Sequence, residues 1–460
     1  MIKPSIPSGT RDFGTSDMLK RNFIFNTIKK NFELFGYSPI ETPAMEKITT
    51  LTGKYGDEGD QLIFKILNSR IHESKQKDTL LNEFKASLEA SKNSEALTEK
   101  ALRYDLTVPF ARYVVMNQHN LIFPFKRYQI QPVWRADRPQ KGRYREFFQC
   151  DADVIGSDSL INELELINLM DKCFAELNIP VLLKFNNRKI LSAIAQVINE
   201  PDKIIEITVA IDKLDKIGVE GVNKELQDSG VSLNAIEQLQ PLINFKGSNL
   251  EKLNVLTKII NTNEIGLKGI EEINFILNYY SQTKLKHILL ELDITLARGL
   301  TYYTGSIFEA KANAGNLTSS ILGGGRYDDL TGIFGLKNMS GVGISFGIDR
   351  IFDVMNELNL YPNAVNQITT TQLLLAHFGN NELTHCLQIA NDLRQHNVNC
   401  EVYPDLAKIK KQFDYANKKQ IPFVCVIGSD EMQTQLYTLK NLETGEQVKL
   451  SLNQIIQKLK

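Results

Sequence analysis

Two stretches of alternating polar and apolar residues, 125–135 and 145–155, constrain the fold of this 460-residue chain more than any other feature. Because side chains alternate between the two faces of a strand, each stretch predicts a β-strand with one apolar and one polar face. The short polar segment 136–144 joins them, so we expect an antiparallel hairpin. The polar face of this hairpin would carry Arg127, Gln129, Gln131, Arg135, Arg145, Gln149, Asp151 and Asp153.

This polar face is charged. Because paired positions on neighbouring strands are only a few ångströms apart, the hairpin places arginines beside carboxylates. Seven lysines and arginines lie between 126 and 145, and the nearest acids are Asp137 and Glu146. A solvated sheet face is one explanation, but so many cations favour a polyphosphate or nucleic-acid ligand. Asp153 and Gln149 have the chemistry to bind an ammonium group.

The composition excludes several classes of protein. With 42% apolar and 23% charged residues, the chain is neither disordered nor collagen-like. The 53 basic and 54 acidic residues give a net charge of −1, so a polyanionic partner must be met by a local patch. The five cysteines form no CxxC pair and the six histidines form no HExxH motif, so the sequence does not favour a structural zinc site.

The sequence also lacks segments typical of export or membrane insertion. Its first fourteen residues contain no apolar run, and no apolar stretch reaches the length of about 18 residues that a spanning helix needs. We therefore expect a cytoplasmic protein with reduced cysteines.

At about 150 residues per domain, the length predicts roughly three domains. Residues 1–186 and 287–360 carry the strand-like and glycine-rich stretches, whereas 187–286 is helical in pattern and reads as an inserted domain. Residues 361–372 (YPNAVNQITTTQ) are mostly polar, and we interpret them as a linker. Residues 371–460 alternate in the order β-α-β-α-β, which predicts a compact α/β domain.

Three further segments complete the pattern within 1–186. Residues 17–35 and 159–178 have the apolar spacing of amphipathic helices. Residues 68–100 are polar and poor in aromatic and β-branched residues, so we expect a solvated insertion with some helix and no site.

A single arginine, Arg298, lies in an otherwise uncharged part of 292–310 and close to Tyr302 and Tyr303. It is either paired in the core or a ligand for an anion. Because a buried unpaired arginine costs several kcal/mol, an anionic group should face it in either case.

A glycine-rich stretch follows at 322–355. Three successive glycines, 323–325, allow the backbone to approach a ligand or another strand closely. Residues 341–350 predict a strand that enters a helix, with Arg350 in its first turn, where cation and helix N-terminus favour phosphate. The glycine spacing does not match a dinucleotide fingerprint, and 52–55 does not match a P-loop.

Together these segments resemble the histidyl-tRNA synthetase family of class II aminoacyl-tRNA synthetases along nearly the whole chain. Tyr37–Pro43 is similar to motif 1, Phe125–Asp153 to motif 2 and Gly341–Arg350 to motif 3. The stretches Arg103–Arg112 and 298–305 are specific to the histidine enzyme. Thr301 departs from the acid that this family more often carries, and the 68–100 insertion affects no motif.

The resemblance implies a fold. We expect an α+β catalytic domain of class II synthetase type, with an antiparallel sheet of six to seven strands. Residues 1–186 would supply motifs 1 and 2 of this core, and 287–360 the histidine stretch and motif 3. The helical insertion would be 187–286, and 371–460 would be an α/β anticodon-binding domain.

The resemblance also implies roles for individual residues. Those expected to bind histidine are Asp105, Leu106, Thr107, Gln149, Asp153, Arg298, Tyr302 and Tyr303, with the glycines 323–325 as the pocket floor. Those expected to bind ATP are Arg135 at the α-phosphate, Arg350 at the γ-phosphate, and Glu146. Arg298 and Arg135 would be catalytic, and Arg138, Lys141 and Arg143 would contact the acceptor end of tRNA. No residues are assigned to a metal.

The implied reaction joins histidine to tRNA(His) in two steps, through histidyl-adenylate and pyrophosphate. ATP would be a substrate, Mg²⁺ the accompanying ion, and the protein a homodimer joined through motif 1 and Pro43. One alternative is a non-catalytic, histidine-binding paralogue that regulates ATP phosphoribosyltransferase. Arg135, Arg350 and the 371–460 segment argue against it, because such paralogues tend to lose them. Another alternative, a structural nucleic-acid-binding protein, would not need Arg298, Tyr302 and Tyr303.

Overall fold

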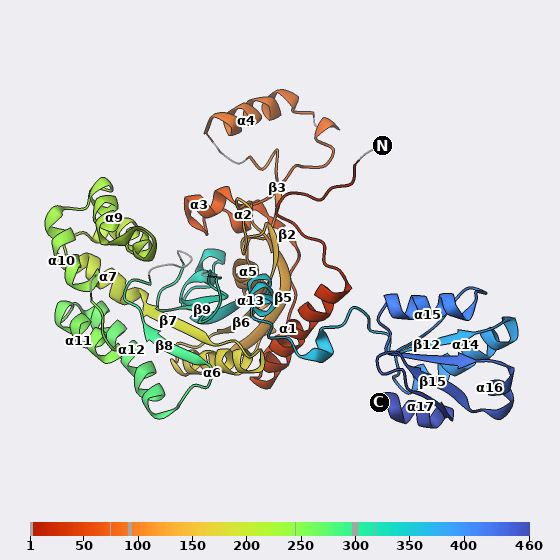
Figure 1. Cartoon of the computed structure of the whole chain (residues 1–460). Helices are drawn as coiled ribbons and strands as arrows, with labels where there is room; N and C mark the ends of the chain where they lie inside the picture. The colour runs from red at the N-terminus through yellow and green to blue at the C-terminus, as the bar shows by residue number, and fades with distance from the viewer. Residues whose placement is uncertain (1–2, 74, 91–93, 244, 297–301, 318) are drawn as a thin grey trace. The chain divides into compact units, whose positions relative to one another are not determined.

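The computed structural model describes residues 3–73, 75–90, 94–243, 245–296, 302–317 and 319–460. The chain divides into two compact units. The first comprises Met1–Arg11 and Phe23–Leu360, and the second comprises Asp12–Asn22 and Tyr361–Lys460. Each unit has its own sheet (Figure 1). No described helix is both long and apolar enough to cross a bilayer.

The first unit is built on a mixed sheet. Among the described residues its strand order is β1-β5-β6-β11-β10-β9-β7-β8. The strands are β1 Ser38–Pro39, β5 Phe125–Trp134, β6 Glu146–Ile155, β7 Val181–Asn187, β8 Ile288–Leu292, β9 Ser306–Ala312, β10 Leu322–Tyr327 and β11 Gly341–Gly347. The middle of the sheet, from β5 to β7, is antiparallel throughout.

This sheet has eight strands in the described chain rather than the six or seven expected. The two edge strands, β1 and β8, add in parallel to β5 and β7. Of these two, β1 is hard to predict from sequence because it is only two residues long and contains Pro39. Proline cannot donate to a ladder and is therefore confined to edges, where β1 lies.

The predicted hairpin is confirmed. Arg127 on β5 lies opposite Asp153 on β6, and Gln129 lies opposite Asp151. The polar face continues onto β11, where Ser345 is opposite Asp151 and Gly343 is opposite Asp153. This face is the floor of the site described below.

Helices cover the other, apolar face. The ring of Phe32, in α1 (Thr15–Leu34), lies 5.5 Å from Tyr128 on β5 and 5.9 Å from Phe346 on β11. Phe174, in α6 (Ile161–Glu176), lies 5.5 Å from the same Phe346. Both helices begin and end within two residues of the ranges predicted from their apolar spacing. α13 (Ile348–Glu357) follows directly from β11, as expected.

The region 187–286 is helical in the structure. Its helices are α7 Arg188–Val197, α8 Ile204–Asp212, α9 Leu214–Asp228, α10 Leu233–Ile243, α11 Asn249–Ile259 and α12 Glu264–Gln282, with the 3₁₀ turn Pro201–Lys203. α12 packs closely on α7. At Gly269 there is no room for a side chain, because a Cβ would lie only 2.9 Å from Ile190.

In its described residues the 68–100 insertion contains the 3₁₀ turn Ile71–Glu73 and the helix α4 (Lys77–Ala90). It extends from a small sheet of β2 (Met45–Lys47), β3 (Lys65–Ile66) and β4 (Lys100–Leu102). Short helices α2 (Ile48–Leu51) and α3 (Gly56–Gln61) precede β3, and α5 (Thr107–Asn117) follows β4. α5 leads directly into the site.

The second unit is an α/β fold. Its strand order is β13-β12-β14-β15-β16, in which β13, β12 and β14 are parallel. The strands are β12 Leu373–His377, β13 Cys400–Val402, β14 Phe423–Ile427, β15 Tyr437–Asn441 and β16 Gln447–Leu450, and the helices are α14 Asn380–Gln395, α15 Ile409–Lys418, α16 Ser429–Thr434 and α17 Leu452–Leu459. The predicted β-α-β-α-β order covers its parallel part. The hairpin β15–β16 and α17 extend it beyond that prediction.

Candidate active site

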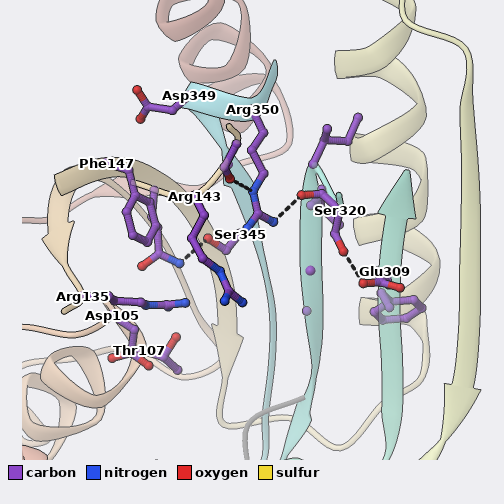
Figure 2. Close-up of a pocket in the computed structure, with 18 of the residues that line it drawn as sticks. Asp105, Thr107, Arg135, Arg143, Phe147, Glu309, Ser320, Ser345, Asp349 and Arg350 are labelled. Carbon is purple, nitrogen blue, oxygen red and sulfur yellow. Dashed lines mark hydrogen bonds between the residues drawn. The ribbon is translucent and has the colours of Figure 1, made fainter. Parts of the chain in front are cut away.

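A cavity of about 330 Å³ lies on the polar face of the first unit's sheet. Its walls come from segments far apart in sequence: the start of α5, the loop after β5, the strands β6, β9, β10 and β11, and the start of α13 (Figure 2). Asp105 and Thr107 lie toward the lower left of this view and Arg350 toward its top (Figure 2). The cavity therefore joins a carboxylate-bearing end to an arginine-bearing end.

Asp105 is the carboxylate of the first end. The buried Arg103 fixes its segment by donating to the carbonyls of Thr42 (2.7 Å) and Pro132 (2.8 Å), which joins it to β5 and the segment after β1. Asp105 itself accepts hydrogen bonds from the hydroxyls of Tyr55 (2.9 Å) and Tyr302 (3.2 Å). Burial nevertheless raises the pKa of Asp105 above its ordinary value. A cationic ligand would stabilise its ionised form.

A second carboxylate cluster lies under the cavity, around Arg127. Its guanidinium is fully buried, and its Nη2 lies 2.7 Å from Asp153 Oδ2 and 4.0 Å from Asp151 Oδ2. The hydroxyl of Tyr327 donates to Asp153 Oδ1 (2.6 Å). Burial raises the pKa of Asp153, and raises that of Asp151 to about 7, although Arg127 opposes both shifts. One arginine for two buried carboxylates leaves an excess of negative charge.

A small cavity of about 20 Å³ reaches this cluster. It shares Thr107, Tyr303 and Ser345 with the main cavity, and Asp151 and Asp153 line it. A space of this size accommodates one water-sized group with polar partners. The negative cluster is therefore within reach of a ligand in the main cavity.

Arg143 and Arg350 form the opposite end, and Arg135 lies beside Asp105, where its charge acts on both Asp105 and Arg350 (Figure 2). The Arg135 guanidinium lies over the ring of Tyr104 (4.2 Å), and its Nε donates to the Tyr104 carbonyl (3.1 Å). Arg350 donates to the carbonyls of Gly142 (2.8 Å) and Ser320 (2.7 Å). Burial lowers the pKa of Arg350, and the nearby charges of Arg135 and Arg143 lower it further. Converging like charges of this kind favour a polyanionic ligand.

Glycines on β10 let the sheet form the floor between the two ends. Gly324 faces β11 so closely that an added Cβ would collide with the Gly343 carbonyl. Gly323, by contrast, would have only one atom within 4 Å of an added Cβ, the Phe308 carbonyl oxygen at 3.9 Å. Both line the cavity. The space above Gly323 is thus available to a ligand.

The structure brings together most of the predicted site residues. Those that line the main cavity are Asp105, Thr107, Arg135, Arg143, Gln149, Tyr302, Tyr303, Gly323, Gly324 and Arg350. Asp153 lines the small cavity instead. Arg298 and Thr301 lie outside the described residues.

Five predicted residues that the structure describes do not line either cavity. Gly325 is buried on β10. Leu106 is fully buried at the start of α5. Glu146 accepts a hydrogen bond from Trp134 Nε1 (2.7 Å). Arg138 and Lys141 are exposed on the basic loop, and Lys141 lies 3.7 Å from Glu357.

Several residues at the site were not predicted from the sequence, because they lie outside the recognised motifs or were given no role there. Tyr55, Tyr327 and Glu309 belong to this group. The position of Tyr327, two residues after the glycine run, was the available signal. No sequence signal pointed to Tyr55, because only the fold brings this residue, which directly precedes α3, beside Asp105.

The comparisons with known proteins agree with this arrangement. Residues 84–351 match the family model "Histidyl-tRNA synthetase", and residues 372–460 match "Anticodon binding domain". A histidine–tRNA ligase of Phocaeicola vulgatus is 58% identical over 445 residues, which cover 97% of this chain and 96% of that protein. One of Cytophaga hutchinsonii is 52% identical and covers both chains completely.

Solved structures are similar over the same length. The crystal structure of histidyl-tRNA synthetase from Nostoc sp. PCC 7120 has a TM-score of 0.81 and 28% identity, and covers 100% of this chain and 99% of its own. A Bacillus halodurans protein described as an ATP phosphoribosyltransferase regulatory subunit/histidyl-tRNA synthetase has a TM-score of 0.70, covers 93% of this chain and all of its own, and at 19% identity shares the fold alone. With a family model over most of the chain and relatives above 50% identity along its whole length, this chain belongs to the histidyl-tRNA synthetase family.

Proposed function

We propose that this chain is a histidine–tRNA ligase that activates histidine with ATP and transfers it to the 3′ end of tRNA(His). The observation that carries the proposal is a cavity with the Asp105 carboxylate at one end and Arg143 and Arg350 at the other, with Arg135 beside Asp105 and a small adjoining cavity that reaches Asp151 and Asp153. Histidine is cationic at its α-amino group and ATP is a polyanion, so the two ends match the two substrates. The 52–58% identical histidine–tRNA ligases support the same reaction.

In this mechanism the negative end binds histidine. Asp105, Thr107, Gln149 and Asp153 would hold its α-ammonium group, with Tyr302 and Tyr303 beside the imidazole ring. Tyr302 is held in place because its hydroxyl donates to Asp105 and its ring packs edge-on against Tyr303 (5.2 Å). These contacts would orient the carboxylate of histidine toward the arginines.

The positive end binds ATP. Histidine's carboxylate would attack the α-phosphorus, forming a carboxylate–phosphate bond as pyrophosphate leaves. Such a reaction needs alignment of two anions and neutralisation of developing charge rather than proton transfer. Arg135 would act at the α-phosphate and Arg350 at the γ-phosphate, and Arg298 at the α-phosphate and histidine carboxylate.

Mg²⁺ would accompany ATP. This ion typically binds through substrate phosphates, waters and one or two carboxylates. The described residues form no cluster of three or more metal-ligating side chains, but Asp137 and Glu309 line the cavity with the arginines. Glu309 also accepts a hydrogen bond from the Ser320 hydroxyl, which orients it. These two carboxylates would hold Mg²⁺, which when bound neutralises charge on the phosphates.

RNA contacts would come from two places. Arg138, Lys141 and Arg143 belong to the loop after β5 and would meet the acceptor end of tRNA, where the adenylate forms. The 371–460 domain would bind the anticodon, as the family model at 372–460 indicates. The whole reaction would take place in the cytoplasm.

We expect histidine-dependent ATP–pyrophosphate exchange, with only trace exchange for the other nineteen amino acids. A pocket built to hydrogen-bond a substrate rejects analogues that leave its buried polar groups unpaired, by factors of about 10⁴ or more. Exchange is measured with each amino acid in turn at matched concentration. Equal exchange with a second amino acid would refute the specificity, and no exchange with any would refute the ligase function.

We expect the protein to be a homodimer. Motif 1 in this class pairs across a two-fold axis, and Pro43 lies in the corresponding segment of this chain. Analytical ultracentrifugation at micromolar concentration measures the oligomeric state. A monomer with full exchange activity would contradict this prediction.

We propose the domain boundaries predicted from sequence, with 187–286 inserted into a catalytic core and 371–460 separate from it. Deletion of 371–460 should then leave pyrophosphate exchange within a few-fold of the full chain and greatly weaken charging of tRNA. This deletion keeps Tyr361, on whose ring Lys20 lies (5.0 Å). Loss of exchange in a truncated protein that circular dichroism shows to be folded would contradict independent domains.

The regulatory paralogue is not favoured. Arg135 and Arg350 line the cavity, and the second unit is present as a complete α/β domain. Curated relatives above 50% identity are histidine–tRNA ligases.

A further inference from the structure

The segment 8–11 lies against the basic loop 137–145 and is not part of any motif described above. Its Gly9 carbonyl accepts a hydrogen bond from the Arg145 backbone N–H (2.8 Å), and its Ser8 carbonyl accepts one from Arg145 Nη1 (3.4 Å). Gly9 has a φ of +85°, and a Cβ there would lie 2.8 Å from the Arg145 side chain. Both the backbone conformation and the close approach require glycine.

Arg11 makes a second set of contacts to the same loop. Its guanidinium lies 3.5 Å from the ring centroid of Tyr144. Its Nη2 is 2.5 Å from Asp349 Oδ1 and its Nη1 is 3.4 Å from Asp353 Oδ1, both on α13. The Tyr144 hydroxyl donates to the other oxygen of Asp353 (2.8 Å). Arg11 thus joins the loop to the first two turns of α13.

Arg350 also belongs to the first turn of α13, directly after Asp349. Figure 2 shows Asp349 and Arg350 leaving this end of the helix in different directions. Arg350 Nε donates to the Gly142 carbonyl of the loop, and Asp349 Oδ2 accepts from the Phe148 backbone N–H (2.9 Å). The loop is therefore held on one side by Arg350 and on the other by the segment 8–11.

Charge balance makes Arg11 important to this arrangement. Without it, Asp349 and Asp353 would place two carboxylates beside the loop and close to the positive end of the cavity, since Asp349 also lines that cavity. The Asp349 side chain is only 5% exposed. Without the charge of Arg11, a carboxylate so little exposed would attract a neighbouring arginine more strongly.

We propose that Arg11 and Gly9 form a positioning element, which holds the loop 137–145 so that Arg135, Arg143 and Arg350 converge on ATP. The inference rests on the proposed function, in which these arginines bind the triphosphate. Arg11 itself is a positioning residue, because the contacts given above join it to Tyr144 on the loop and to Asp349 and Asp353 on α13. Residues at the histidine end, such as Asp105 and Asp153, make no contact with this segment among the interactions given above.

The test compares Arg11→Met with Lys189→Met in the full-length enzyme. Lys189 forms an ion pair of similar burial with Glu272 (2.7 Å) in the helical insertion, so its loss controls for removing a paired cation. We expect Arg11→Met to lower kcat/KM for ATP in pyrophosphate exchange by about 10²-fold, as small misplacements of catalytic groups do. KM for histidine should stay within about twofold, and Lys189→Met should change neither.

Two more variants separate positioning from charge and from misfolding. Arg11→Lys keeps the charge but loses the planar contact with Tyr144 and the two-carboxylate geometry, so it should recover only part of the ATP defect. Gly9→Ala keeps every charge and should still weaken ATP use, because its Cβ displaces Arg145. Full recovery by Arg11→Lys, or normal ATP kinetics in both Arg11→Met and Gly9→Ala, would overturn the inference.

A binding readout completes the experiment without relying on turnover. Trp134 is the single tryptophan of the chain and directly precedes Arg135. Its fluorescence during an ATP titration should give a weaker ATP affinity for Arg11→Met and an unchanged one for Lys189→Met. An equal rise in KM for histidine and ATP would also contradict the inference. Absence of histidine-dependent exchange in the parent enzyme would instead refute the proposed function.

Discussion

Replacing Arg135 with glutamine should slow adenylate formation by about 10²- to 10³-fold, the range expected for removing one preorganised electrostatic donor. Arg135 lines the cavity and stacks on Tyr104 (4.2 Å), with Phe147 at 5.3 Å. Its orientation is thus set before ATP arrives. Because the substitution removes the hydrogen bond from the Arg135 side chain to the Tyr104 carbonyl and keeps the backbone bond from Arg135 to Arg145, the free energy of unfolding should change by only about 1 kcal/mol.

Single-turnover formation of histidyl-adenylate measures the effect, with a thermal melt on the same sample. Arg135→Lys is the matched variant, since it keeps the charge and loses the planar stacking, so we expect an intermediate rate. A parental rate in Arg135→Gln would exclude a catalytic role. A large loss of stability with an unchanged rate for the folded fraction would identify Arg135 as a structural residue.

Replacing Arg127 with methionine should lower the free energy of unfolding by about 3–5 kcal/mol, because it leaves buried carboxylates without their cation. Arg127 is fully buried, and Asp151 and Asp153 lie beside it. Chemical denaturation at pH 7 measures the loss. Lys29→Met, which breaks an exposed pair with Glu33, should cost less than about 1 kcal/mol.

The pH dependence of this loss follows from the same cluster. Burial already raises the pKa of Asp151 to about 7 and raises that of Asp153. A carboxyl group with a raised pKa in the folded state binds protons that the unfolded state does not hold, so stability falls as pH rises through that range. Removing Arg127 raises both pKa values further, and the loss should therefore be larger at pH 8 than at pH 5.

A double variant tests the cause. Adding Asp153→Asn to Arg127→Met removes one uncompensated charge, so part of the lost stability should return. Strictly additive losses, or a loss independent of pH, would show that packing around Arg127 rather than charge determines the effect.

Local pattern determined a large part of this fold. The period of two in 125–135 and 145–155 is sufficient to predict β5, β6 and a hairpin with arginines beside carboxylates, and the structure adds the register that places Arg127 opposite Asp153. Apolar spacing likewise predicts α1 and α6, whose rings cover the apolar face. These features depend on residues near one another in the chain, which is why sequence reasoning reaches them. The two-residue strand β1 carries too little pattern to be counted.

The site needed more than pattern. Motif resemblance named Asp105, Gln149 and Arg350, and the structure places them around one cavity. The resemblance could not show that Trp134 Nε1 donates a hydrogen bond to Glu146 outside that cavity. Nor could it show that the Tyr55 hydroxyl donates one to Asp105. Both results depend on which side of a strand or helix meets which neighbour.

By itself the sequence determined the family, the order of strands and helices around the motifs, and the residue types that two oppositely charged substrates require. Only the tertiary structure decided which charges are buried together, as with Arg127, Asp151 and Asp153, and which segment holds the basic loop, as with Arg11 on Asp349. The physical reason is that secondary structure follows from short-range periodicity. Burial and charge pairing instead depend on how the elements pack, which joins neighbouring strands as at Arg127 and Asp153 and also residues hundreds of positions apart, such as Arg11 and Asp349.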